Sequence, residues 1–177
     1  MPIDAPPVRL RAWCDTDIDA LVELANSRKV WRNLSDLFPH PYTREHARAW
    51  VAHCAALPEG HSAWAIERDG VLCGGVGLRR GQDVMRFSAD LGYWLGELHW
   101  GRGTATAAVC AAVDWAFAHT DLKRIGARVM YWNPASARVL EKAGFRAEGR
   151  TRLSSFKDGY FVDDLHFGRL RGDLCIL

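Results

Sequence analysis

The spacing of apolar residues changes near residue 60, and this change constrains the fold more than any other feature of the sequence. Before it, residues 15–26 and 43–57 carry apolar side chains at i, i+3, i+4 and i+7, which predicts two amphipathic helices. After it, residues 62–68 and 71–78 follow the period of strands, and Asp69-Gly70 between them is typical of a two-residue hairpin turn. The chain therefore combines helices with an antiparallel hairpin.

Strand and helix patterns alternate along the whole chain without a linker. We expect further strands at residues 8–13, 85–95 and 124–131, and two more around an Asp-Gly turn at 157–159. We expect a long helix that opens at Gly101 and a short one at 133–144, whose first residues, Asn133 and Pro134, are a good cap and a good first helical residue. Residues 28–42 contain prolines and predict a loop or broken helix. Residues 1–177 therefore predict a single domain of the α/β (α+β) class.

The charge balance argues against a dedicated nucleic-acid binder. The 177 residues include 23 Lys and Arg and 21 Asp and Glu, for a formal charge of +2, whereas a DNA-binding domain presents a strongly basic face or arm. The longest apolar stretch, residues 105–113, is far shorter than the roughly 20 residues needed to cross a bilayer. Five cysteines without a CxxC pair favour reduced thiols. We expect a cytoplasmic protein without a membrane segment.

The histidines do not form a metal-binding motif. His46 and His53 lie on one predicted helix, but no HExxH motif or carboxylate partner accompanies them. We expect no metal ion.

A glycine-rich segment, residues 100–105, stands between a predicted strand and a predicted helix. Unpaired N–H groups at a helix N-terminus attract anions, so a pyrophosphate could bind there, although a glycine pair before a helix is often only a turn. A dinucleotide fold is a weaker alternative, because Thr106 stands where its third glycine belongs, and it would make the chain a nucleotide-dependent oxidoreductase. No Walker loop and no GxSxG motif are present.

Several motifs occur in a fixed order along the chain: residues 92–95 (Gly-Tyr-Trp-Leu), 100–106 (Trp-Gly-Arg-Gly-Thr-Ala-Thr), 133–136 (Asn-Pro-Ala-Ser), 140–145 (Leu-Glu-Lys-Ala-Gly-Phe) and the Asp-Gly turn at 158–159. In this order and spacing they resemble the GCN5-related N-acetyltransferase (GNAT) superfamily, and within it the ribosomal-protein N-terminal acetyltransferase (Rim) branch. The resemblance covers nearly the whole chain. It departs from the family at Trp100, where Gln or Arg is common.

The resemblance implies a GNAT fold, with a mixed, mostly antiparallel sheet of six to seven strands flanked by about four helices, and acetyl-CoA as the cofactor. By similarity, the backbone of Tyr93, Trp94 and Leu95 pairs with pantetheine as an added strand would. The family positions that would hold the pyrophosphate are Trp100, Gly101, Arg102, Gly103, Thr104, Ala105 and Thr106. Asn133 and Ser136 match positions near the CoA thiol.

Acetyl transfer requires an oxyanion donor, a proton acceptor for the amine and a proton donor for the thiolate. The backbone N–H of Leu95 is our candidate for the first. Asp90 is either the proton acceptor, through ordered water, or a solvated strand carboxylate. Ser136 is either the proton donor or a residue with a local backbone hydrogen bond at the start of its helix. Asn133 completes the set of candidate catalytic residues.

The acceptor is less constrained by the sequence. We expect the aromatic segment 28–42 to frame it, through Trp31, Asn33, Phe38, His40 and Tyr42, with His40 either a substrate contact or a loop histidine packed on its neighbours. The carboxylates Asp163 and Asp164 either meet a cationic substrate or, in the favoured interpretation, belong to a solvated edge strand.

The sequence therefore predicts an acetyl-CoA-dependent N-acetyltransferase that acts on a primary amine, by direct attack on the thioester. The amine is that of a peptide or protein N-terminus or of a small molecule. The alternative is a non-catalytic acyl-CoA-binding module of the same fold. The family resemblance also suggests a homodimer.

Overall fold

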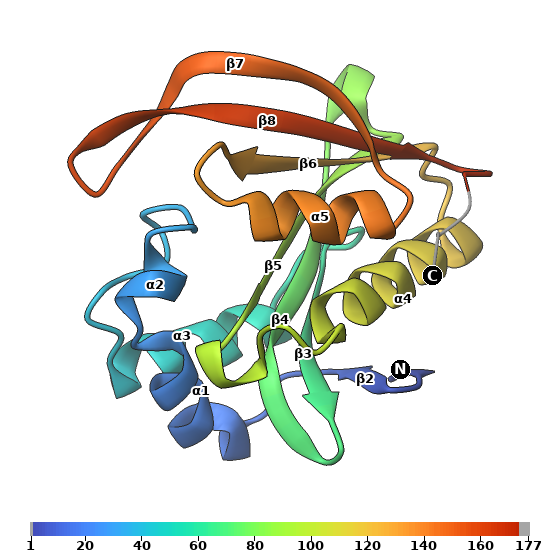
Figure 1. Cartoon of the computed structure of the whole chain (residues 1–177). Coiled ribbons are helices and arrows are strands. Elements are labelled where there is room, and N and C mark those ends of the chain that lie inside the picture. Colours follow the sequence, from blue (N-terminus) through green and yellow to red (C-terminus); the bar gives the residue numbers. More distant parts are fainter. Residues whose placement is uncertain (1, 174–177) are drawn as a thin grey trace.

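The computed structural model describes residues 2–173, which contain one eight-stranded sheet in the order β1-β2-β3-β4-β5-β6-β8-β7 (Figure 1). Neighbouring strands are antiparallel except β5 and β6, which are parallel. The strands are β1 (Ile3–Ala5), β2 (Val8–Arg11), β3 (Ser62–Arg68), β4 (Val71–Arg80), β5 (Ser88–Leu95), β6 (Arg124–Met130), β7 (Arg146–Lys157) and β8 (Tyr160–Leu170).

Five α-helices accompany the sheet in the described part of the chain. They are α1 (Ile18–Ala25), α2 (Arg28–Trp31), α3 (Arg44–Ala55), α4 (Thr104–His119) and α5 (Pro134–Lys142). Single turns of 3-10 helix lie at Asp15–Asp17, Asp83–Met85 and Glu97–His99.

The architecture confirms the mixed, mostly antiparallel sheet, with one strand more than expected. The additional strand, β1, is only three residues long and pairs with β2, so it is too short for a period of two to reveal it. The expected strand at 85–95 begins at Ser88, because the residues before it form a 3-10 turn. The helices number five rather than about four, because α2 forms a single turn in the aromatic segment.

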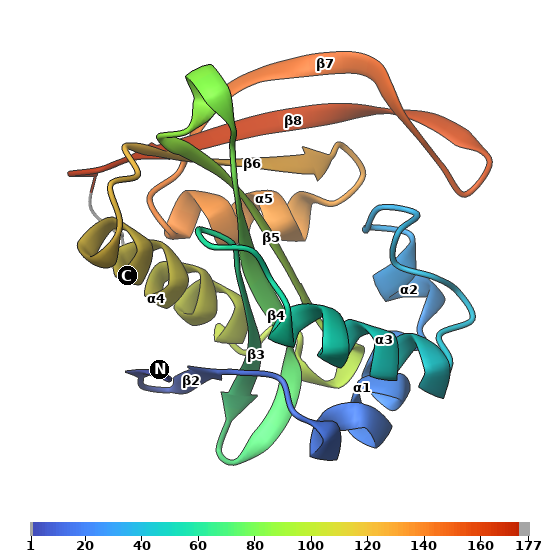
Figure 2. The same cartoon turned by 180° about the vertical axis from the view of Figure 1, so that it is seen from behind.

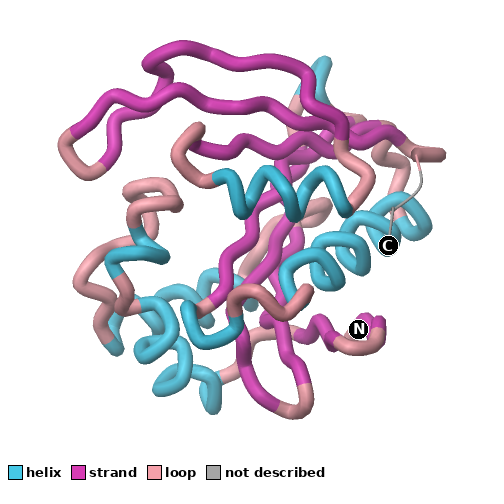
Figure 3. Tube along the Cα trace, in the orientation of Figure 1, coloured by secondary structure: helices cyan, strands magenta, loops and turns pink. Residues whose placement is uncertain are grey.

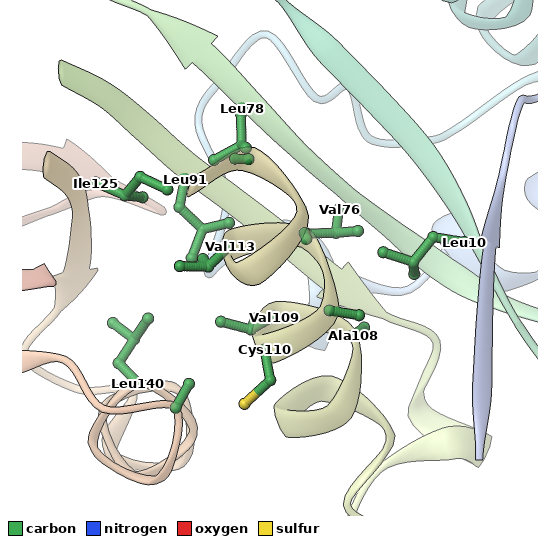
Figure 4. Close-up of a cluster of buried hydrophobic side chains, with 14 of the residues drawn as sticks. Leu10, Val76, Leu78, Leu91, Ala108, Val109, Cys110, Val113, Ile125 and Leu140 are labelled. Carbon is green, nitrogen blue, oxygen red and sulfur yellow. The ribbon is translucent and has the colours of Figure 1, made fainter. Parts of the chain in front are cut away.

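Helices α4 and α5 cover one face of the sheet and α1 and α3 cover the other, as the opposite views in Figures 1 and 2 show. The larger core lies under α4, whose small side chains let it approach the sheet closely. In Figure 4, Val109 and Val113 of α4 meet Leu91 of β5 and Leu140 of α5. All four side chains are buried, and burying a side chain of this size contributes about 1.5–3 kcal/mol. This core fixes α5 against β5.

Strands β5 and β6 separate halfway along their length (Figure 3). They pair from Ser88 with Arg124 to Leu91 with Ala127. From Gly92 to Leu95, β5 remains paired with β4 but has no pairing with β6. One edge of β5 is therefore open over its last four residues.

The cysteines differ from the expectation of uniformly reduced thiols. Cys14, Cys54 and Cys73 are free, whereas Cys110 is disulfide-bonded. Cys175 lies outside the described residues. Burial raises the pKa of the Cys54 thiol to about 12, so this thiol remains protonated and unreactive at neutral pH. No helix in residues 2–173 is long and apolar enough to cross a membrane.

Candidate active site

A cleft of about 1810 Å³ includes the separation between β5 and β6 and extends along β4, α3 and the aromatic segment. Its walls come from elements that are far apart in sequence: the open end of β5, the start of α4, the start of α5, the aromatic segment and β8. The lining includes Leu95, Gly103, Ser136, Phe38 and Asp164. The fold therefore brings most of the motifs singled out in the sequence to one opening.

The backbone of β5 presents hydrogen-bonding groups to this cleft. The Gly96 N–H donates to the Cys73 carbonyl of β4 at 3.0 Å. Because backbone groups alternate in direction along a strand, Tyr93 and Leu95 direct their N–H and C=O groups away from β4, towards the cleft, whereas those of Trp94 point to β4. An extended chain of amides in the cleft could pair with Tyr93 and Leu95.

Trp100, the residue that departs from the family pattern, has a specific partner. Its indole Nε1 donates to the Leu95 carbonyl at 2.8 Å. The indole thus ties the loop before α4 to the open end of β5, and it occupies one of the two Leu95 backbone groups that face the cleft. The Leu95 N–H is not part of this contact.

The loop before α4 requires its glycines. Gly101 and Gly103 have φ values of 72° and 75°, in the left-handed region that favours glycine. An added Cβ at either position would meet nothing within 4 Å, so the backbone is open to a ligand. Gly103 is the N-cap of α4, and the N–H groups of the first helical turn have no partner within the helix. This geometry suits an anion.

A second residue holds this loop and carries no signal in the sequence. The Arg68 guanidinium donates to the Arg102 carbonyl at 2.7 Å and to the Thr104 hydroxyl at 3.0 Å. Thr104 is consequently buried, 1% exposed, and its hydroxyl faces Arg68. Arg68 lies 34 residues before the loop, so only the tertiary fold brings the two together.

Ser136 and Tyr93 meet across the cleft, from α5 and β5. The Ser136 Oγ lies 2.7 Å from the Tyr93 hydroxyl, which also donates to the Ser136 carbonyl at 3.0 Å. The local contact at this helix start is made by Asn133, whose Oδ1 accepts the Ser136 N–H at 3.2 Å. Burial raises the pKa of Tyr93 well above its usual value, so the phenol is neutral. The structure thus assigns helix capping to Asn133 and leaves the Ser136 hydroxyl with Tyr93.

Asp90 lies apart from this pair. Its side chain is 70% exposed and forms an ion pair with Arg79 at 3.0 Å. Asp90 precedes Leu95 by five residues on the same strand, which corresponds to about 17 Å at the rise of a β-strand. Direct contact between Asp90 and a group held at the Leu95 N–H is therefore excluded.

The expected acceptor residues divide into two groups. Asn33, Phe38 and Tyr42 line the cleft, and Phe38 packs on both Tyr42 and Trp94, with ring centroids 5.0 and 5.3 Å away.

Trp31 and His40 lie outside the described lining and pack on each other at 5.7 Å. The Trp31 ring also contacts Lys157, whose Nζ lies 3.8 Å from the ring centroid. Trp31 therefore supports the wall of the cleft from outside.

Lys157 is a residue that sequence reasoning missed. It precedes an Asp-Gly turn, a position that normally faces solvent, yet its side chain is only 1% exposed and its Nζ donates to Asp36 at 2.7 Å. The neighbouring Asp158 forms an ion pair with Arg28 of α2 at 2.8 Å. Together these contacts fasten the tip of the β7–β8 hairpin to α2 and the segment after it (Figure 1).

The interpretation of Asp163 and Asp164 as residues of a solvated edge strand is wrong. β8 is an interior strand between β6 and β7, because the chain turns back after α5 to place β7 at the edge. Asp163 accepts from Arg150 and from the Leu153 N–H, and these contacts lower its pKa. Asp164 is 1% exposed and lines the cleft.

Within residues 2–173, no group of three or more His, Cys, Asp or Glu side chains is arranged to hold a metal ion. His46 instead accepts the Thr43 N–H at 3.1 Å and completes the cap of α3.

Sequence comparison assigns a family to this fold with its open edge on β5. The acetyltransferase (GNAT) domain model matches residues 8–146. The chain belongs to the GNAT acetyltransferase family.

Individual relatives support this assignment. The chain is 30% identical over 154 residues to the uncharacterized N-acetyltransferase YoaA of Bacillus subtilis (strain 168), over 85% of each protein. It is 25% identical over 166 residues to the ribosomal-protein-serine acetyltransferase of Escherichia coli (strain K12), over 92% of each. A structure of RimL, the ribosomal L7/L12 alpha-N-protein acetyltransferase in complex with coenzyme A, superposes with a TM-score of 0.86 at 21% identity, over 100% of both chains. This last similarity concerns the fold.

The curated relatives with higher identity, 35–46%, match only part of the chain. The chain spans about half of their length, between 42% and 50%.

Proposed function

We propose that the protein transfers the acetyl group of acetyl-CoA to a primary amine. The observation that carries this proposal is the open edge of β5 together with the contact between Tyr93, on that edge, and Ser136 at the start of α5. Family membership and the coenzyme A bound to RimL, a protein of the same fold, support acetyl-CoA as the cofactor.

In this proposal, the backbone N–H and C=O of Tyr93, which point into the cleft, would hold the pantetheine arm, because the Leu95 carbonyl already accepts from Trp100. Trp94 contributes its side chain to the wall beside Phe38. The N–H groups of residues 102–106, at the start of α4, would hold the pyrophosphate, and the exposed Arg102 side chain would add its positive charge there. When bound, the cofactor supplies an activated thioester.

Leu95, Ser136 and Asp90 then have different roles in the proposed reaction. The Leu95 N–H stabilises the oxyanion formed when the amine attacks the thioester carbonyl. The Ser136 hydroxyl, held by Tyr93, donates a proton to the departing thiolate. Asp90 acts only through a relay of ordered water, because about 17 Å of strand separates it from Leu95. If Asp90 belongs to this relay, Asp90→Asn removes one ionisation from the pH–rate profile; an unchanged profile excludes it.

We propose a terminal amine of a peptide or protein as the first acceptor class, by analogy with the ribosomal-protein-serine acetyltransferase of E. coli. A small-molecule amine is the second class. A homodimer in the cytoplasm is also proposed, and a monomer at micromolar concentration by light scattering would exclude the dimer.

Calorimetric titration with acetyl-CoA, with NADH as the control ligand, tests the cofactor. Saturable binding of acetyl-CoA alone supports the proposal, and binding of neither or of NADH contradicts it. A mass-spectrometric screen of peptide, polyamine and amino-acid amines then tests turnover. Binding without any acetylated product would establish the non-catalytic acyl-CoA-binding module instead.

A further inference from the structure

Asp164 is a buried carboxylate whose charge has little compensation among the described residues. Its Oδ2 accepts from the hydroxyls of Ser154 and Ser155 at 2.8 and 2.6 Å. Its nearest cation is the Arg128 Nε, 3.8 Å from Oδ2, on a side chain that is 64% exposed. Lys157, the buried lysine nearby in sequence, pairs with Asp36 instead.

The two oxygens of Asp164 are used unequally. Among residues 2–173, the side-chain hydrogen bonds and the ion pair of Asp164 all involve Oδ2, and none involves Oδ1. The residue nevertheless lines the cleft, with 1% of its surface exposed. Burying a carboxylate is costly unless it is paired and fully hydrogen-bonded. A cation in the cleft would supply the missing partner.

The strand register places Asp164 at the level of the proposed reaction centre. Leu91 pairs with Ala127, and Met130, three residues further along β6, pairs with Asp164. Three residues beyond Leu91 is Trp94, next to Leu95. Asp164 therefore lies across the opening at the height of the Leu95 N–H, whereas Asp90 lies at the closed end where β5 and β6 still pair.

Asp164 also lies on the face of the sheet opposite to α4 and α5. Directly paired residues of antiparallel strands share a face, so Asp164 shares the face of Met130. Along β6, Ile125 and Val129 belong to the core under α4 and α5, and the alternation of the strand directs Met130 to the opposite face. An acceptor that enters from that face meets the Asp164 carboxylate on its way to the thioester.

We propose that Asp164 binds the acceptor as an ammonium ion, through its free Oδ1. This inference rests on the proposed function and names its substrate class: an amine that is protonated in solution, such as a peptide α-amine or an alkyl amine. A neutral analogue of the same shape lacks the charge that Asp164 selects and binds more weakly.

The test compares two peptides that differ by one group. Alanyl-alanyl-alanine amide carries an α-ammonium, and propionyl-alanyl-alanine amide is the same molecule without it; spermidine is a second ammonium probe. Each is titrated calorimetrically into the cofactor-free protein and into the protein saturated with CoA. We expect the wild type to bind at least one ammonium probe, and to prefer the ammonium peptide to its neutral partner by about 10-fold or more if that peptide is the one bound. A tenfold preference in Kd is about the size expected from one hydrogen bond to a charged group.

Asp164→Asn should abolish this preference, or weaken the binding of spermidine by the same factor. The Kd for CoA should stay within about twofold of the wild-type value. The matched control is Asp121→Asn, the same change at an exposed carboxylate that pairs with Arg80 and is not part of the cleft lining, and it should leave all Kd values unchanged. A preference that survives Asp164→Asn overturns the proposal. So does a wild type that binds neither ammonium probe or does not distinguish charged from neutral peptide.

A second variant keeps the test decisive if Asp164→Asn does not fold. Arg128→Gln removes the exposed cation that competes for Asp164, so ammonium binding should tighten at least about twofold; no change or weaker binding contradicts the proposal. Failure of CoA to bind the wild type would refute the proposed function alone, because the titrations of the cofactor-free protein still decide the role of Asp164.

Discussion

At the scale of single residues, the hydroxyl of Ser136 offers the sharpest test of the chemistry. It is held by Tyr93 rather than by the helix backbone. Because loss of a general acid typically costs 10²-fold or more, we expect Ser136→Ala to lower kcat by about that factor without changing the Kd for acetyl-CoA.

Tyr93→Phe keeps the Ser136 hydroxyl but removes its partner, so its kcat should lie between those of the wild type and Ser136→Ala. Steady-state kinetics and calorimetry measure both quantities. A fully active Ser136→Ala enzyme would exclude the proton-donor role.

The buried phenol of Tyr42 should make the stability of the protein depend on pH in the alkaline range. Burial raises its pKa from about 10 to about 12. In this window the unfolded chain ionises the phenol while the folded chain keeps it protonated, so the free energy of unfolding contributed by Tyr42 is fully present below pH 10 and is lost as the pH rises through 12.

Urea unfolding at pH 8, 10 and 11 measures this effect. Tyr42→Phe should lose less stability between pH 8 and 11 than the wild type does. Parallel curves for the two proteins would show that Tyr42 does not contribute.

At the scale of elements, α5 depends on one anchor. Leu140 is fully buried in the core under α4 (Figure 4), and truncation of such a leucine costs about 2–5 kcal/mol. We expect Leu140→Ala to lower the free energy of unfolding by that amount in urea denaturation. The neighbouring exposed residue gives the control: Glu141→Ala should change it by less than about 0.5 kcal/mol. Equal effects would contradict the packing argument.

A substitution in the loop before α4 should weaken the binding of acetyl-CoA more than it lowers the stability of the protein. Gly103 has a positive φ and open space around it, so Gly103→Val strains the backbone by about 1–2 kcal/mol and covers the N–H groups of the helix start. We expect the affinity for acetyl-CoA to fall at least about tenfold by calorimetry. Gly149→Val, at an open position without a positive φ, should retain the wild-type affinity. Unchanged affinity in Gly103→Val would refute the phosphate site.

Local signals in the sequence predicted local structure well. Both Asp-Gly turns adopt positive φ at both residues, at 69–70 and 158–159, as a type I′ hairpin requires. Asn133 caps α5 with Pro134 as its first residue. These features depend on neighbours along the chain, and the sequence displays them directly.

The features that the sequence did not predict depend on contacts between distant segments. Asp164 looked like a residue of an edge strand because the order β6-β8-β7 cannot be read from strand spacing. Lys157 carried no signal in the sequence because its partner, Asp36, lies 121 residues away. Trp31 and His40 share the aromatic segment with Phe38 but are not part of the cleft lining. Composition places such residues near a site without telling which way they point.

At the scale of the whole molecule, the hairpin tip is fastened through Lys157. Lys157→Met keeps most of the apolar stem but removes the ion pair with Asp36 and the contact with Trp31. We expect faster amide hydrogen exchange across residues 155–161, measured by mass spectrometry, with little change in α4. Lys123→Met, at an exposed lysine, is the control. Unaltered exchange in Lys157→Met would show that the hairpin is held by other contacts.

The fastening of the hairpin gives the opening a closed rim. At one end β5 and β6 are joined by their last pair, Leu91 with Ala127, and at the other the hairpin tip is joined to α2 and the segment after it through Asp158 and Lys157. An open groove can bind a polymer along its length, whereas an opening that is closed at both ends admits only the end of the polymer. For the proposed reaction, we therefore expect the width of the acceptor to matter as well as its charge: a slender chain terminus should reach the thioester, and a branched or folded segment should not.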